Sequence, residues 1–152
     1  MSKQFDNFKM ASVTPPAAIV DNASFTTAEV DTAGWDMARI VVYLGATDIA
    51  MAALKVTESN TSASGHADIT GAVFGTSTDI DGSTSALPTA TDDNKFFVVD
   101  LDLRGRKRYL DVVATAGDGS TGTYAAIWCE LYRGDAMPSS KTGHGVGGML
   151  RV

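Results

Sequence analysis

The densest group of charged side chains is a basic run that surrounds one glycine and consists of Arg104, Arg106, Lys107 and Arg108. Guanidinium groups bind carboxylates through paired hydrogen bonds, so this run could contact an acidic partner, although a solvated turn is the simpler interpretation. The chain as a whole has 12 lysines and arginines against 18 aspartates and glutamates, which gives a net charge of −6. An acidic protein is poorly suited to phosphate backbones or anionic lipid surfaces. We therefore expect neither nucleic acid nor membrane as a partner.

A second candidate for chemistry is a short acidic stretch in which Asp79 and Asp81 have the spacing that opens a calcium loop. An EF-hand places a glutamate at the twelfth position, which is Ala90 in this chain. A different calcium site, formed by these aspartates with Asp92 or Asp93, stays open. A solvated turn held by aspartate side chains is the simpler interpretation.

The remaining reactive side chains lack the spacing that catalysis or metal binding requires. His66 and His144 stand in Gly- and Ser-rich stretches without a zinc-type pair. Residues 143–148 match a dinucleotide fingerprint only formally, because no strand–helix unit surrounds them. Cys129 is the single cysteine, so no intrachain disulfide forms, and its apolar surroundings predict a core position. Carboxylates are numerous enough to pair in three dimensions, but the sequence nominates no pair, and we expect a protein that is not an enzyme and has no cofactor.

The elements that would position these residues are predicted to be strands. Apolar residues alternate with polar ones, or run together, in eight segments: 24–30, 39–44, 53–59, 67–69, 72–74, 95–103, 107–115 and 123–132. The last three segments are separated by glycine-containing turns, which predicts an antiparallel meander with the basic run at a hairpin tip. So many short strands favour an all-β chain, an antiparallel β-sandwich or jelly roll.

The chain divides into an N-terminal arm (1–23), a β-sandwich domain (24–133) and a Gly/Ser-rich, flexible C-terminal tail (134–152). The arm is polar and without periodicity apart from Phe5, Phe8 and Met10, which need a surface, either on the domain itself or on a neighbouring subunit. The long polar excursion over 59–94 is typical of a functional surface. No apolar run has the length of a signal-peptide core near the start or of a membrane-spanning helix anywhere, so we expect synthesis in a cytoplasm.

Several strand and turn motifs resemble those of the small head-decoration proteins of tailed phages. They are VDLDLRGRKRYL at 99–110 with the VVAT strand at 112–115, TAGWD at 32–36, LKVTES at 54–59 and ITG at 69–71. The resemblance covers residues 24–133 and leaves out both terminal regions.

This resemblance implies a jelly-roll-like domain that assembles as a homotrimer on the outside of an expanded capsid. There it would clamp neighbouring subunits of the major capsid protein, without catalytic residues or cofactors, as a part of the virion. Extended arms in such proteins reach onto adjacent subunits, so deletion of residues 1–20 should weaken attachment and leave the fold intact. The candidate partner-binding residues are Phe5, Phe8, Met10, Arg104, Arg106, Lys107 and Arg108.

Two other functions fit a β-sandwich composition. A carbohydrate-binding or adhesion module would use exposed aromatic rings, for which Trp35, Trp128 and Tyr132 are the candidates. Trp128 lies within a predicted strand and is expected in the core or a subunit interface. A phage fibre or baseplate component is the other alternative, and it would share the trimeric assembly.

Overall fold

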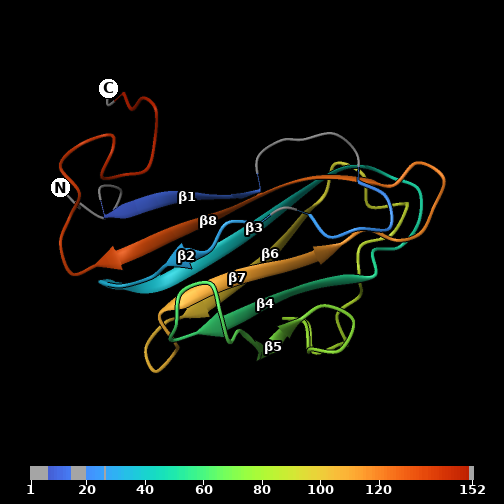
Figure 1. The fold of residues 1–152 in the computed structure, drawn as a ribbon, viewed down its shortest axis with the longest axis horizontal. Coiled ribbons are helices and arrows are strands. Elements are labelled where there is room, and N and C mark those ends of the chain that lie inside the picture. The colour runs from blue at the N-terminus through green and yellow to red at the C-terminus, as the bar shows by residue number, and fades with distance from the viewer. Residues whose placement is uncertain (1–6, 15–19, 26, 151–152) are drawn as a thin grey trace.

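The computed structural model describes residues 7–14, 20–25 and 27–150. In these residues the chain forms two four-stranded antiparallel sheets and no helix (Figure 1), which confirms the all-β prediction. Sheet A has the order β1 (Phe8–Thr14), β8 (Thr123–Gly134), β3 (Trp35–Thr47) and β6 (Phe96–Asp102). Sheet B has the order β2 (Val30–Asp31), β7 (Tyr109–Thr115), β4 (Ala53–Ser59) and β5 (Ala67–Val73). No described helix is long and apolar enough to cross a membrane.

The strands pair in nested order: the first pairs with the last, the second with the second last, and so on inward. β1 pairs with β8, β2 with β7, β3 with β6 and β4 with β5, all antiparallel. Two further pairings, β3 with β8 and β4 with β7, join these ribbons into the two sheets. Only β4 and β5 are both consecutive in the chain and adjacent in a sheet, so the other connections cross between the sheets.

The predicted meander over 95–132 is wrong. β6 and β8 lie in sheet A, with β3 between them, and β7 lies in sheet B. The basic run is therefore a connection between the two sheets and not a hairpin tip. Alternation of apolar residues shows that one side of a strand is buried. The pattern is the same whether two consecutive strands lie side by side in one sheet or face each other in the two sheets of a sandwich.

The core lies between the inner faces of the sheets and includes the inward residues that the alternation predicted in β4, β7 and β8, together with others that it did not predict, such as Val13 of β1. Leu110, Val112 and Ala114 of β7 are at most 2% exposed, and Ile127 and Cys129 of β8 at most 1%. Each large apolar side chain buried in this way contributes about 1.5–3 kcal/mol to folding. The buried position of Cys129 raises the pKa of its thiol to about 12, which confirms that this cysteine is a core residue.

The segment 24–30 does not form the predicted first strand. Of its described residues (24, 25 and 27–30), only Ser24 makes a bridge, to Thr115, before the two-residue strand β2 begins at Val30. Phe25 is nevertheless buried, and its N–H donates to the carbonyl of Ala114 at 2.8 Å. The apolar residues of this segment thus mark burial against the end of β7 and not a regular strand.

The N-terminal region is not simply an extended arm, because β1 occupies part of it. β1 pairs with β8 from Phe8 opposite Tyr132 to Thr14 opposite Ile127. Its inward positions include Lys9 and only small or β-branched residues, so the alternation is too weak to see in the sequence. Deletion of residues 1–20 would remove β1, an edge strand of sheet A, so we expect this deletion to destabilise the fold.

Candidate functional site

Three of the four basic side chains in the run form ion pairs with acidic side chains of the same chain. Arg104 pairs with Asp102, Arg106 with Glu58 and Arg108 with Asp31. The backbone N–H of Lys107 donates to the Glu58 carboxylate at 3.2 Å, while its ammonium group has no ion pair with a described residue. These contacts connect the run to β2, β4 and β6. In this structure the run therefore fixes a connection between sheets, and little of its positive charge is left unmatched for a partner.

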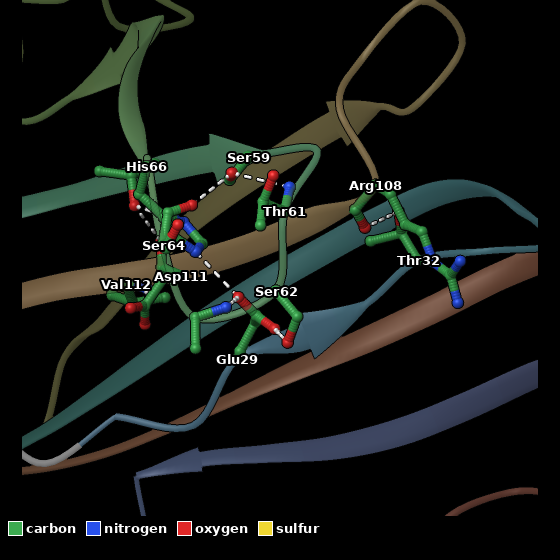
Figure 2. Close-up of polar contacts among 12 residues, drawn as sticks. Glu29, Thr32, Ser59, Thr61, Ser62, Ser64, His66, Arg108, Asp111 and Val112 are labelled. Carbon is green, nitrogen blue, oxygen red and sulfur yellow. Dashed lines mark hydrogen bonds and ion pairs between the residues drawn. The ribbon is translucent and has the colours of Figure 1, made fainter.

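The ion pair of Arg108 with Asp31 is bidentate. Its Nε and Nη2 atoms donate to the two carboxylate oxygens at 2.8 and 2.7 Å. The Thr32 hydroxyl donates to the carbonyl of Arg108 at 2.6 Å (Figure 2). The hydrogen bonds from Arg108 lower the pKa of Asp31 to about 2, because they favour the ionised carboxylate. The pair holds the short edge strand β2 against β7.

The predicted N-terminal contact residues sit on the chain's own surface where the structure describes them. The N–H of Met10 donates to the carbonyl of His144 at 2.8 Å, and His144 Nδ1 lies 2.8 Å from the carbonyl of Phe8. The rings of Phe8 and His144 are also in contact, with centroids 4.7 Å apart. This is one of the two positions expected for Phe8 and Met10. Phe5 lies outside the described residues.

Residues 140–146, named here the C-terminal clasp, lie along the outer edge of β1. The clasp is a compact turn in which His144 and Val146 donate to the carbonyls of Ser140 and Lys141, each at 3.0 Å. His144 is 1% exposed, and a side chain at Gly145 would stand 1.9 Å from the carbonyl oxygen of Met10. This part of the predicted flexible tail is therefore packed on the sheet (Figure 1).

A polar cluster around Glu29 ties the β4–β5 connection to the segment before β2 (Figure 2). The Glu29 carboxylate accepts hydrogen bonds from the Ser62 hydroxyl (2.6 Å), the Ala63 N–H (2.7 Å) and His66 Nε2 (2.8 Å). These hydrogen bonds lower the pKa of Glu29, and the bond from Ser62 has the largest effect. The Ser62 hydroxyl donates to Glu29 and not to His66, so the cluster lacks the serine–histidine contact of a nucleophilic site. It is a structural anchor.

The acidic loop residues do not converge. Asp81 accepts from the N–H of Ser83 at 2.8 Å, and Asp92 accepts from the N–H of Thr89 at 2.7 Å, each within its own turn. Asp93 instead caps a backbone N–H in β3. No three acidic, histidine or cysteine side chains in the described ranges are placed to hold a metal ion. The structure thus gives the calcium hypothesis no ligand set among these residues.

A groove of about 760 Å³ runs beside β6, at a place that the sequence did not indicate. It lies between β6 on one side and the end of β5 with the segment 77–89 on the other. Its apolar lining comprises Ala72, Val73, Phe74, Ile80, Leu87, Phe96, Phe97, Val98 and Val99. Phe74 and Phe97 meet edge to face at the inner side, with ring centroids 5.5 Å apart. Its volume is in the range of roughly 300–1,000 Å³ that is usual for ligand sites.

The backbone of β6 is unpaired along this groove. Leu103 donates its N–H to the carbonyl of Asp36 at 2.8 Å, which makes this pair a hydrogen-bonded one in the β3–β6 register. Because such pairs alternate along antiparallel strands, Phe96, Val98 and Asp100 point their N–H and C=O groups away from β3. Among the strands of the described residues, none pairs with β6 on that side. The strand therefore offers a free edge.

The outer face of sheet A carries many apolar side chains around a charged group and leads to this edge. Alternation and register place on it the charged residues Arg39, Asp100, Asp102 and Glu130 and the apolar or aromatic residues Phe8, Met10, Met37, Val41, Tyr43, Phe96, Val98, Trp128 and Tyr132. Phe96 is 59% and Val98 45% exposed, and Phe96 stacks on Tyr43 at 4.6 Å. Of the candidates for sugar binding, Trp128 and Tyr132 are half-buried on this face, whereas Trp35 is half-buried and packs against the core. The outer face of sheet B is more polar, with Lys55, Thr57, Asp68 and Asp111.

One signal in the sequence could have pointed to this edge. Residues 96–99 are all apolar, so Phe96 and Val98 are apolar on the side of β6 that alternation assigns to solvent. Such a pattern indicates a strand that is either buried on both faces or used for contact. The groove itself depends on segment 77–89, whose position no local pattern gives.

No family model matches the chain, and no curated protein matches it either.

Proposed function

We propose that the chain is a capsid decoration (cement) protein. It binds the outside of an expanded tailed-phage head as a homotrimer and stabilises contacts between major capsid subunits, without catalysis and without a cofactor. The observation that carries this proposal is the apolar, aromatic outer face of sheet A, which continues into the free edge of β6. Large exposed apolar surfaces on soluble domains are typical of protein-binding sites.

The strand order supports the jelly-roll assignment within this proposal. The sheets have the orders β1-β8-β3-β6 and β2-β7-β4-β5. This arrangement results when four nested antiparallel strand pairs are divided between two facing sheets. The resemblance to head-decoration proteins implies the same architecture. The two arguments are independent, because one uses sequence motifs and the other uses long-range pairing.

The energetics of such a protein favour several modest contacts over one strong one. A standard interface covers about 800 Å² per partner, and three linked copies would bind with a high effective concentration. Binding only to the expanded lattice would stabilise that state by mass action. An apolar face on one sheet and a polar face on the other suit a protein that lies on a surface with one side outward.

The test is co-sedimentation of the purified protein with unexpanded and expanded capsids of the phage that encodes it. We expect saturable binding to expanded shells alone, and a trimeric mass in sedimentation. Tyr43→Lys on the outer face of sheet A should reduce binding by at least about tenfold, since it places a charge in the apolar contact. Val113→Lys on the outer face of sheet B is the matched control and should bind normally. Absence of binding to expanded shells would contradict the proposal.

A further inference from the structure

We propose that the groove beside β6 binds an extended, basic and apolar segment of the major capsid protein, which adds to sheet A as a fifth strand. This inference rests on the proposed function, because it names the part of the partner that the site takes. The proposal combines three properties of the groove: a free strand edge, an apolar lining and an acidic charge.

The free edge supplies the backbone contacts. Phe96, Val98 and Asp100 each present one N–H and one C=O that no described residue uses. An antiparallel strand that pairs with these positions would exchange two hydrogen bonds with each of them. Strand addition of this kind gives affinity through the backbone and specificity through pockets for alternate side chains.

The lining supplies the pockets. On one side of an added strand, alternate side chains would face Phe74, Phe97 and Leu87 between the sheets. On the other side they would continue the outer face of sheet A beside Phe96 and Val98. An added strand with apolar residues on both sides is therefore favoured, and β6, with seven residues, can pair with about five to seven of them.

The charge of the groove selects a basic segment. The lining contains Asp79, Asp92 and Asp100 and no lysine or arginine. Asp92 and Asp100 form ion pairs with Lys95 and Arg39, whereas Asp79 has no ion pair with a described residue. A cation on the incoming strand would therefore meet Asp79 as an uncompensated charge.

A second copy of this chain fits the groove less well. Two copies of β6 paired edge to edge would bring the two acidic linings together, and like charges across such an interface are unfavourable. The other edge of sheet A is also closed to a neighbour, because the clasp occupies it through Met10 and His144. The charge of the groove thus favours a segment from a different protein.

The first experiment uses two capped heptapeptides, one of the sequence VVKKVVK and one with glutamate in place of each lysine, so that both sides of the added strand carry valine. We expect the full-length protein to bind the lysine peptide at least about tenfold more tightly in calorimetry. Bound peptide should slow amide exchange at Phe96, Val98 and Asp100, measured by NMR. Equal affinity for both peptides, or protection elsewhere but not on β6, would overturn the inference.

The second experiment compares Val98→Pro with Val98→Ala. The N–H of Val98 points away from β3, and proline is tolerated at such positions of edge strands. Both variants should fold, but only the proline removes a hydrogen-bond donor and blocks the edge. We expect Val98→Pro to bind the lysine peptide and the expanded capsid at least about tenfold more weakly than Val98→Ala. Equal binding by the two variants would overturn the inference.

Two charge-reversal variants, one in the groove and one away from it, test the site independently if the proline variant does not fold. Asp79→Lys in the groove should weaken binding of the lysine peptide by about three- to tenfold, while Asp135→Lys, at the far end of β8, should not. Equal effects of the two would contradict the site.

The two proposals fail in different ways. A protein that binds the lysine peptide on β6 but does not sediment with expanded capsids would refute the capsid function alone. A protein that binds capsids with no effect of Val98→Pro would refute the groove alone. Protection of the β6 amides that rises with protein concentration, without peptide, would indicate a second copy in the groove and overturn the inference.

Discussion

The two edges of sheet A differ in whether the outward backbone groups of the edge strand have hydrogen-bond partners. At one edge the clasp covers β1, and the N–H of Met10 and the carbonyl of Phe8 both have partners in His144. At the other edge no described segment covers β6 in this way, and its outward backbone groups border a groove. Exposed strand edges tend to pair with other chains, so proteins usually protect them. An edge left open beside a protected one indicates a surface that is kept for binding.

The difference follows from what comes next in the chain. β8 lies beside β1, and the chain leaving β8 at Gly134 can turn back along β1 within a few residues. The segment before β6 instead crosses from β5 in the other sheet and stands away from the β6 edge. The groove is the space that this crossing leaves.

The largest expected effect is in amide exchange, which compares neighbouring residues on one strand. The amides of Val98 and Asp100 should exchange at least about 100-fold faster than those of Val99 and Leu101, since only the latter donate to β3. Measurement by NMR on the free protein suffices, with Met10 on the covered edge as an internal reference. Equal protection along β6 would show that the edge is already occupied.

The next largest expected effect is a loss of stability when the clasp that covers β1 is disturbed. Gly145→Ala should lower the free energy of unfolding by about 2 kcal/mol, because the added carbon meets the Met10 carbonyl and the backbone has a φ of +70°. Urea denaturation measures the loss, and faster exchange of the Met10 amide would locate it. Gly147→Ala is the matched control, since nothing lies within 4 Å of the added carbon. Similar losses in both variants would mean that the clasp does not protect β1.

The smallest effect concerns the edge of sheet B, where the ion pair of Asp31 with Arg108 holds β2. Asp31→Asn should cost less than about 1 kcal/mol at neutral pH, because the pair is exposed. The carboxylate has a pKa of about 2 when folded and about 3.9 in an unfolded chain, so its contribution is full above pH 4 and is lost as the pH falls through 2. The difference between wild type and variant should vanish there in urea titrations. A difference that grows on acidification would refute the pair's role, and Asp135→Asn controls for the general loss of charge.

The sequence predicted the strands better than their arrangement. Alternation located β4, β6, β7 and β8 and their inward residues, such as Leu110 and Ile127, because burial of one face leaves a period of two. It overlooked β1, where Lys9 interrupts the pattern, and joined β6, β7 and β8 into one sheet. It also placed the basic run at a hairpin tip, since the acidic partners that hold the run between the sheets, Asp31 and Glu58, are distant in the chain.

By itself, then, the sequence determined an acidic, all-β chain with a cysteine in the core and the inward faces of β4, β6, β7 and β8. Those properties depend on local composition and on the two-residue period of the backbone. Only the tertiary structure decided which strands are neighbours, which edge is covered and where the groove lies. These depend on contacts between residues far apart in the chain, such as Met10 with His144 and Phe74 with Phe97, and local sequence carries no record of such distances.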